Sequence, residues 1–139
     1  SVRWSAIHWN RLRYLNLSAG WFLTDSAVAI FNTKHLPALT ELDLSWNSAP
    51  VPEGTAQSWG DILVGEAVNS PLFARLSKLW LRRTDLTDDG AKALIASPTA
   101  GKFTLLDLSE NKLSDAMMNA LRERFGEGVC AFDTPEPND

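Results

Sequence analysis

The chain has few of the residues that chemistry at a protein site usually needs. Its 139 residues include one cysteine, Cys130, and two histidines, so an internal disulfide is excluded and a metal site has few thiolate or imidazole ligands. The formal net charge of -4 argues against general nucleic-acid binding, which needs a broad basic face. No apolar run approaches the roughly 18 residues of a membrane span. We therefore expect neither nucleic acid nor a membrane as partner.

The sequence also lacks the motifs of the common catalytic sites. It has no phosphate-binding glycine loop, nucleophile elbow or metalloprotease motif, and Cys130 lies in an apolar segment, where a buried and inert thiol is expected. His8 and His35 precede Leu12 and Leu39 by the same interval, but no Cys, Asp or Glu is spaced to complete a metal site with them. Exposed loop histidines are the favoured interpretation. We predict no enzyme activity, no cofactor and no metal.

One pattern of apolar residues occurs four times. Its clearest copy, FTLLDLSENKL (Phe103–Leu113), has apolar residues at places one, four and six, asparagine at place nine and leucine at place eleven. The other copies begin at Leu12, Leu39 and Leu76, so the first and the last intervals between copies are equal and the middle interval is longer. The pattern is the signature of a leucine-rich repeat, and its period of about 27 residues falls within the range of such repeats.

Each copy predicts a short strand, a turn, a helix and a return loop, and stacked copies align their strands in a parallel sheet. In the first copy, Thr24 is the expected helix N-cap. Leu23, Ala27 and Phe31 lie at helical spacing and are expected in the core. Thr87 is the corresponding cap in the third copy.

The longer interval, from Leu39 to Leu76, places ten extra residues in the second copy, between Asn47 and Trp59. Pro50, Pro52 and Gly54 fall in this stretch. Proline and glycine at this density disfavour helix. We therefore predict a projecting loop at the end of the second strand.

The helix starts with Asp-x-Gly, the Ala-Ser-Pro return and the LRERFGEGV ending resemble the ribonuclease-inhibitor-like class of leucine-rich repeats, and bacterial arrays of that class in particular. The resemblance implies an α/β fold, a right-handed solenoid (horseshoe) with a parallel sheet on the concave face and helices on the convex face. Secreted members commonly cap their ends with disulfides, which a single cysteine cannot form. We therefore expect a cytoplasmic protein.

The copies organise residues 1–132 as one domain, with a last strand at 129–132. The acidic, proline-containing residues 133–139 predict a disordered tail. At the other end, Trp4 and the residues after it overlay the segment one period later without a gap, so residues 1–11 are interpreted as half a repeat. The chain is then a C-terminal fragment of a longer array, and its apolar first end is expected to self-associate.

The resemblance implies a scaffold that binds another protein, and side chains that alternate out of the core on the concave face are the candidates. Places five and seven hold Trp80 and Arg82 in the third copy, whereas the other copies have Asx and Ser there. Tryptophan and arginine are enriched at binding hot spots. The predicted partner-binding residues are Trp80, Arg82, Trp46, Asp43, Lys78 and Arg83.

Other interpretations stay open at this point. Trp80 and Arg82 can instead serve the fold, by packing against or pairing with neighbours on the same face: Tyr14, Trp46, Asp43 and Asp107. The chain as a whole also fits a structural capping segment of a longer multidomain protein, or an accessory arm that recruits substrates to an enzyme.

Overall fold

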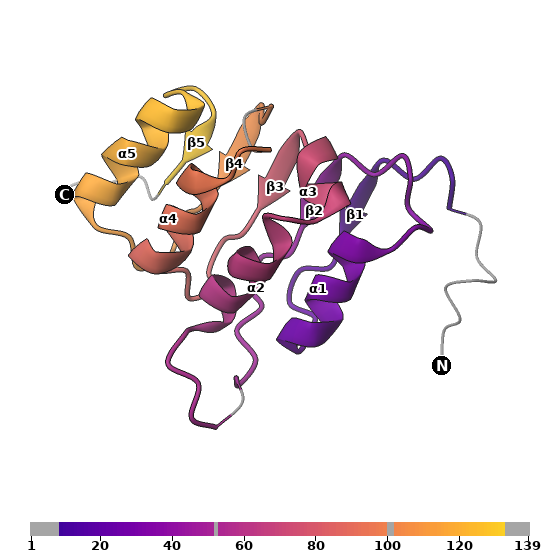
Figure 1. Ribbon diagram of the computed structural model, residues 1–139, viewed down its shortest axis with the longest axis horizontal. Helices are drawn as coiled ribbons and strands as arrows, with labels where there is room; N and C mark the ends of the chain where they lie inside the picture. The colour runs from indigo at the N-terminus through magenta and orange to yellow at the C-terminus, as the bar shows by residue number, and fades with distance from the viewer. Residues whose placement is uncertain (1–8, 52, 100–101, 133–139) are drawn as a thin grey trace, which may run out of the picture.

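The computed structural model describes residues 9–51, 53–99 and 102–132. Within them, five strands form one open parallel sheet in the order β1-β2-β3-β4-β5, so consecutive strands are also neighbours in space (Figure 1). The strands are β1 (Tyr14–Asn16), β2 (Glu41–Asp43), β3 (Lys78–Trp80), β4 (Leu105–Asp107) and β5 (Cys130–Ala131). The helices are α1 (Thr24–Asn32), α2 (Trp59–Ala67), α3 (Pro71–Arg75), α4 (Asp88–Ala96) and α5 (Asp115–Phe125).

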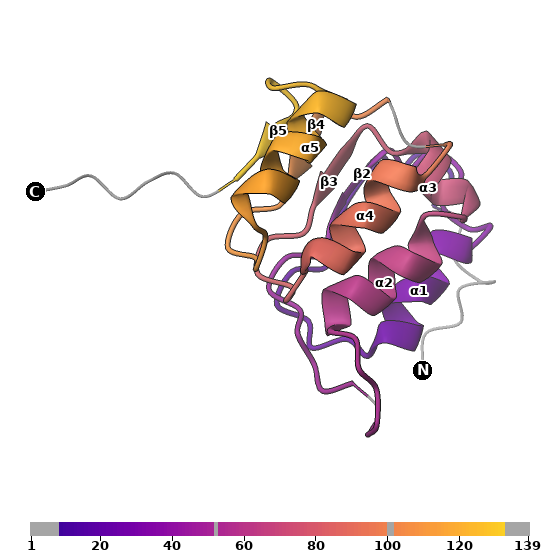
Figure 2. The ribbon, with the colours of Figure 1, turned by 60° about the vertical axis from the view of Figure 1, so that its left-hand side comes forward.

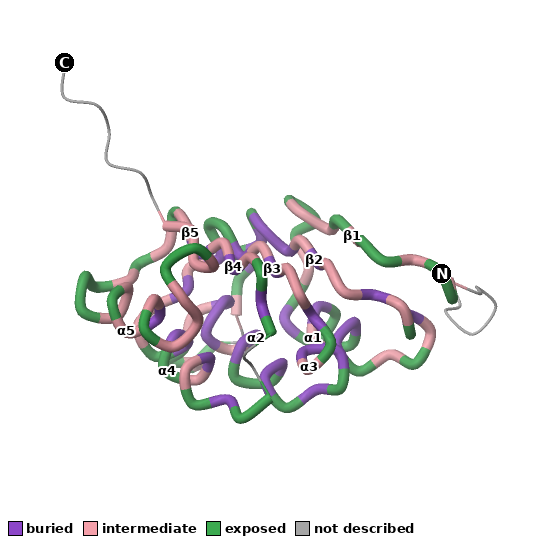
Figure 3. Tube along the Cα trace, turned by 90° about the horizontal axis from the view of Figure 1, so that it is seen from above, coloured by how far each residue is buried: buried purple, intermediate pink, exposed green. Residues whose placement is uncertain are grey.

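The helices lie along one face of the sheet. Figure 2 shows α1, α2, α4 and α5 side by side over the strands, and Figure 3 shows the strands along one side of the molecule and the helices along the other. Parallel sheets in α/β domains are usually covered on both faces. Here no helix of the described residues covers the second face, which we call the open face.

The strands are aligned in register by their central leucines. Leu15, Leu42, Leu79 and Leu106 are Cα partners across successive strands, and Cys130 of β5 pairs with the last of them. The three inner leucines of β2, β3 and β4 are buried. Because side chains alternate along a strand, the residues on either side of each leucine point to the open face. The prediction of an α/β fold with a parallel sheet is confirmed.

The predicted helix caps are partly confirmed. The hydroxyl of Thr87 accepts a hydrogen bond from Asp89 N (3.3 Å) at the start of α4. The prediction for Thr24 is wrong, because α1 begins with this residue and the N-cap position is held by Leu23, without a side-chain hydrogen bond. Leu23 is 60% exposed and not in the core. Ala27 and Phe31 are buried as predicted, Ile30 is buried beside them, and Phe22 packs against the core in a partly buried position.

The inserted residues form the predicted loop, which projects beyond α2 at the bottom of Figure 1. Its first part is more packed than expected, since Ala49 is buried and Val51 packs against the core. At its other end, the hydroxyl of Ser58 accepts a hydrogen bond from Asp61 N (3.2 Å) and caps α2. The short helix α3 was not anticipated; it begins with a proline after the cap residue Ser70, an arrangement suited to a helix start.

Deleting residues 49–58, which restores the regular period of the copies, is expected to leave unfolding cooperative. We expect a loss of about 1–2 kcal/mol in the free energy of unfolding, because the Ser58 cap and the burial of Ala49 are removed while closing a shorter loop costs little. Urea denaturation followed by circular dichroism measures it. A chain with a Gly/Ser loop of equal length in place of residues 50–57 is the matched control, and loss of cooperative unfolding in the deletion alone would contradict the prediction.

The predicted half repeat lies largely outside the described residues, as do His8 and the predicted tail. Trp9, the first described residue, packs partly against the core.

Candidate functional site

The open face carries two rows of side chains, one on each side of the central leucines. The first row runs across the strands from Tyr14 through Glu41 and Lys78, and the second from Asn16 through Asp43 and Trp80. Neighbouring members of a row are register partners, so they lie about 4.8 Å apart. The sheet thereby brings side chains from all the copies onto one surface.

An aromatic pair crosses the middle of this surface. The rings of Tyr14 and Trp80 meet edge to face, with their centroids 5.7 Å apart, although they belong to β1 and β3. Both side chains therefore reach over β2. Tyr14 remains 45% exposed, so the pair exposes apolar area to solvent. It also connects β1 to β3 across β2. An edge-to-face pair contributes about 0.5–1.5 kcal/mol beyond its buried area.

Arg82 connects the turn after β3 with β4. Its Nε donates to the hydroxyl of Ser109 (3.1 Å) and lies 3.9 Å from Asp107 Oδ2, and its Nη2 lies 3.5 Å from Glu110 Oε2. The guanidinium is thus held by acidic partners of the fourth copy. The suggested pairing with Asp107 is found. Asp43 uses its Oδ1 to accept a hydrogen bond from Ser45 N (2.9 Å).

The turns after the strands repeat an unusual backbone conformation at place eight. Ala19, Trp46, Arg83 and Glu110 all have φ between 50° and 62°, in the left-handed region that non-glycine residues rarely adopt. The side chains of two neighbouring turns then meet, since the Arg83 guanidinium lies 4.7 Å from the centroid of the Trp46 ring. Trp46 is 43% exposed.

The six predicted partner-binding residues therefore all lie on β2, β3 or the turns after them. Lys78 Nζ is 3.4 Å from Glu41 Oε1 in the first row, and Asp43 and Trp80 are register partners in the second. Sequence reasoning named Tyr14 only as a possible packing partner of Trp80, and this pair is found. It left out Trp21, which is 73% exposed. Trp21 lies in the turn after β1, between that strand and α1. Whether these residues bind a partner stays a prediction.

Asparagines at place nine, of which Asn47 is buried and Asn111 partly buried, hold the turns at the edge of this surface. Asn47 donates from Nδ2 to the carbonyls of Leu17 (3.1 Å), Leu44 (2.9 Å) and Ser45 (3.3 Å), and its Oδ1 accepts from Phe22 N (3.3 Å). Two of these groups belong to the preceding copy.

Asn111 makes the equivalent contacts two copies later. Its Nδ2 donates to the carbonyls of Leu81 (2.7 Å) and Leu108 (3.1 Å), and its Oδ1 accepts from Leu86 N (3.0 Å). In the third copy Thr84 takes the place of the asparagine and donates from its hydroxyl to Leu81 O (3.1 Å).

Aspartates on the helices make the reverse connection, to the following copy. The buried carboxylate of Asp61 accepts hydrogen bonds from Thr87 N (2.8 Å), Thr87 Oγ1 (2.5 Å) and Gly90 N (3.1 Å) at the start of α4. Asp88 has the same place one copy later and accepts from Ser114 N (2.9 Å) and Ser114 Oγ (2.7 Å).

The hydrogen bonds from Ser114 lower the pKa of Asp88 below its ordinary value of 3.8. A carboxylate whose pKa is depressed on folding stabilises the fold above its unfolded pKa. This contribution is therefore present at neutral pH and is lost as the pH falls through the lowered pKa.

The described residues offer little to a metal ion or to nucleophilic chemistry. No group of three or more His, Cys, Asp or Glu side chains among them is placed to hold a metal. Burial raises the pKa of the Cys130 thiol, an effect that the nearby Arg122 partly opposes, so the thiolate is disfavoured. In the part of the chain that the structure describes, no helix has the length and apolar character to cross a membrane.

Comparison with protein families gives one match. Residues 35–48 match the family described as Leucine Rich repeat, and this segment contains the return loop before β2, β2 itself and the turn after it. The chain thus contains a leucine-rich repeat, a motif that commonly mediates protein–protein interaction and is typically non-enzymatic. A comparison with curated proteins found no match.

Proposed function

We propose that the chain binds another protein through the open face of the sheet and the strand-to-helix turns beside it. The observation that carries this proposal is a parallel sheet covered by helices on one face, with half-exposed aromatic and charged side chains on the other. The leucine-rich repeat at residues 35–48 supports a protein as the partner. Aromatic and arginine side chains on a rigid sheet need little ordering on binding, which favours affinity.

We further infer that the four copies belong to the ribonuclease-inhibitor-like class, of the bacterial type, and that they form a right-handed solenoid. We infer a cytoplasmic location. The alternation of each strand with a helix, and the common register of the central leucines, support the solenoid. The open face is then its concave side. The binding surface consists of Trp80, Arg82, Trp46, Asp43, Lys78 and Arg83, with Tyr14 added from the structure.

A second candidate is a purely structural role, in which the same side chains stiffen an array. The Tyr14–Trp80 pair and the acidic partners of Arg82 favour this role, because the aromatic pair connects the first copy to the third and Arg82 connects the third to the fourth. The two functions predict different effects of truncating these side chains. Loss of a structural contact lowers the free energy of unfolding, whereas loss of a binding contact lowers the affinity for the partner. The accessory arm of an enzyme is a special case of the first function, with an enzyme or its substrate as partner.

Replacing Trp80 by alanine is expected to weaken partner binding about 30-fold or more, which corresponds to about 2 kcal/mol at a hot spot. The free energy of unfolding should fall by only about 1 kcal/mol, since the lost contact is one aromatic pair at the surface. The partner is first captured from a lysate of the source cells. Calorimetry with the purified partner then measures both quantities.

Arg83→Ala tests whether the turn after β3 contributes to partner affinity. Lys92→Ala is the matched control, because Lys92 is exposed on α4, on the helix-covered side of the sheet. Support requires that the open-face variants lose affinity while the control keeps it. Unchanged affinity of Trp80→Ala, together with a large loss of stability, would identify the side chain as a packing residue and favour the structural role.

A further inference from the structure

The aromatic pair on the open face passes between two carboxylates. Tyr14 and Trp80 come from β1 and β3, and their ring centroids lie 5.7 Å apart, so the pair crosses β2. Tyr14 is the register partner of Glu41, and Trp80 is the register partner of Asp43. Residues two apart on a strand point to the same face. The two acids of β2 therefore lie on the side of the sheet that carries the rings, one beside each end of the pair.

The two acids differ in the cations that neutralise them. Glu41 has a partner, since Lys78 Nζ lies 3.4 Å from its Oε1. Arg82, two places after the tryptophan of the pair, is engaged by acids of the fourth copy instead. Asp43 has no ion pair within the described part of the chain, and its Oδ1 accepts one hydrogen bond, from Ser45 N (2.9 Å). The negative charge of Asp43 is thus the one on β2 that the fold leaves without a cation.

A partly exposed carboxylate beside aromatic rings suits a guanidinium group. Arginine stacks on aromatic faces and bonds a carboxylate through two parallel N–H groups, whereas the ammonium of lysine is a more strongly hydrated point charge. The same surface already holds one contact of this kind, because the Arg83 guanidinium lies 4.7 Å from the centroid of the Trp46 ring. The chemistry beside Asp43 therefore favours arginine over lysine.

We propose that the open face binds an arginine side chain of the partner, with the guanidinium stacked on Trp80 and paired with Asp43. This inference rests on the proposed function, because the arginine belongs to the protein that the open face binds. The site is accessible, since Tyr14 is 45% exposed and Trp80 and Asp43 are partly exposed. The net charge of -4 also attracts a basic partner as it approaches.

Titration of the isotope-labelled full chain with N-acetyl-arginine amide tests the site without the partner. We expect saturable shifts of the Trp80 indole N–H and the Asp43 amide resonances, with a Kd of about 1 mM for so small a probe. N-acetyl-citrulline amide has nearly the same shape but no charge, and it should give no saturable shift. Equal shifts with both probes, or no saturation with the arginine probe, would overturn the proposal.

Asp43→Asn removes the charge and keeps the shape of the side chain. The first copy shows that the turn accepts this residue, because Asn16 at the same place accepts the same hydrogen bond through its Oδ1, from Ser18 N (2.8 Å). We expect the Kd of the arginine probe to rise about fivefold. Glu66→Gln, which removes an equal charge from an exposed position on α2, is the matched control and should change the Kd by less than about twofold. Equal effects of the two variants would overturn the proposal.

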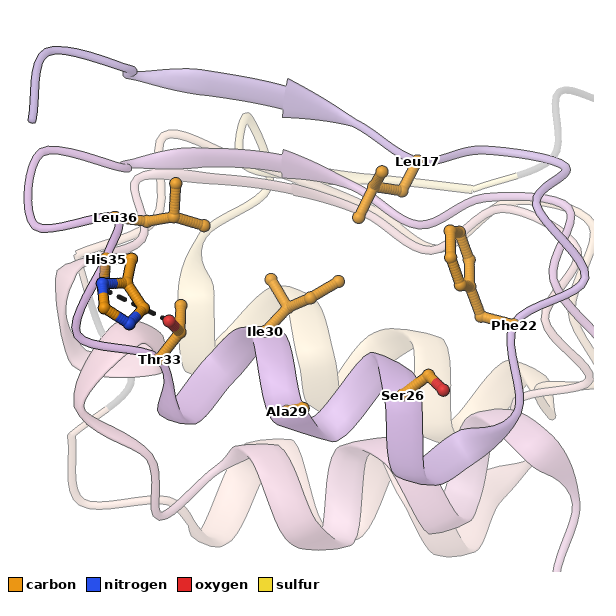
Figure 4. Close-up of a pocket in the computed structure, with 8 residues that line it drawn as sticks. All are labelled: Leu17, Phe22, Ser26, Ala29, Ile30, Thr33, His35 and Leu36. Carbon is orange, nitrogen blue, oxygen red and sulfur yellow. Dashed lines mark hydrogen bonds between the residues drawn. The ribbon is translucent and has the colours of Figure 1, made fainter. Parts of the chain in front are cut away.

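An apolar pocket at the β1 end of the core provides an internal reference for the titration. It measures about 420 Å³, and Leu17 from the strand side and Ile30 from the helix side point into it (Figure 4). Its described lining has no Asp or Glu, so a guanidinium finds no carboxylate there. The methyl resonances of Leu17 and Ile30 should stay unshifted. Shifts there as large as those at Trp80 would show unspecific binding and overturn the proposal.

The captured partner separates this inference from the proposed function. We expect Trp80→Ala and Asp43→Asn both to weaken partner binding, while Glu66→Gln leaves it unchanged. Loss of affinity in Trp80→Ala but not in Asp43→Asn would show that the open face binds the partner without an arginine at Asp43, so this inference alone would fail. Unchanged affinity in both variants would overturn the proposed function together with it.

Discussion

Replacing Asp61 by alanine is expected to lower the free energy of unfolding by about 3–5 kcal/mol. The carboxylate is 4% exposed and accepts three hydrogen bonds at the start of α4, from the backbone N–H of Thr87 and Gly90 and from the Thr87 hydroxyl. Its removal leaves the buried Gly90 N–H and the partly buried Thr87 donors without their acceptor, at about 1–3 kcal/mol for each buried unsatisfied group. Urea denaturation measures the loss.

Two matched variants show which property of Asp61 matters. Asp61→Asn keeps an acceptor oxygen for the two backbone donors and should cost less than half as much as Asp61→Ala. Asp88→Ala removes the aspartate at the same place in the next copy, where the carboxylate is only partly buried, and its effect should be smaller still. A stability of Asp61→Ala within about 1 kcal/mol of the unmodified chain, a margin typical of surface changes, would contradict the prediction.

Replacing Asn47 by alanine should cost about 3 kcal/mol or more in the free energy of unfolding. The side chain is fully buried, and it satisfies carbonyls on both sides of the joint between the first and second copies. No other group of similar shape can donate twice and accept once there. The loss is measured by denaturation of the purified chain.

The third copy supplies a natural control for Asn47. Thr84 stands at the same place and bonds Leu81 O with its hydroxyl, so Asn47→Thr should restore one of the lost hydrogen bonds and recover about 1 kcal/mol. Equal stability of the threonine and alanine variants would show that burial, rather than hydrogen bonding, dominates at place nine.

The apolar core of the repeats could be predicted from the sequence, because the central leucine of each strand recurs at a fixed place and can face only one side of the sheet. Leu42, Leu79 and Leu106 stand at the same place of three copies. Because side chains alternate along a strand, the recurrence of leucine at this place directs all three to the core. The start of the first helix was harder to predict, because Leu23 begins an apolar series with Ala27 and Phe31, whereas Asp25 and Ser26 follow Phe22 at helical spacing. The place of Leu86 in the third copy, which corresponds to Phe22, would have decided between them.

The candidate site was only partly predictable, because its contacts join residues far apart in the sequence. Trp80 was identified by its departure from the other copies. Tyr14 and Trp46 were both named as possible packing partners, but the sequence could not decide for Tyr14, which lies two strands away. The pairing of Arg82 with Glu110 depends on the left-handed turn after β4. Asp61 was overlooked although Asp88 and Asp115 hold the same place in later copies; this recurrence of an acid was the signal.

The aspartates and asparagines make the stack uneven in stiffness. At the joint between the third and fourth copies, Asp88 accepts hydrogen bonds from the following copy and Asn111 donates to the preceding copy. This joint therefore has both kinds of polar connection, which we call clasps. At the joint between the first and second copies, Asn47 supplies one clasp, but Thr24 stands where the acid would be. The joint between the second and third copies also has one clasp, that of Asp61, because Thr84 replaces the asparagine and its hydroxyl bonds within its own copy. Polar connections of both kinds are therefore found at the joint between β3 and β4. Tyr14 and Trp46 lie on the two sides of the joint between the first and second copies, so a partner that contacts both would connect two copies that share a single clasp.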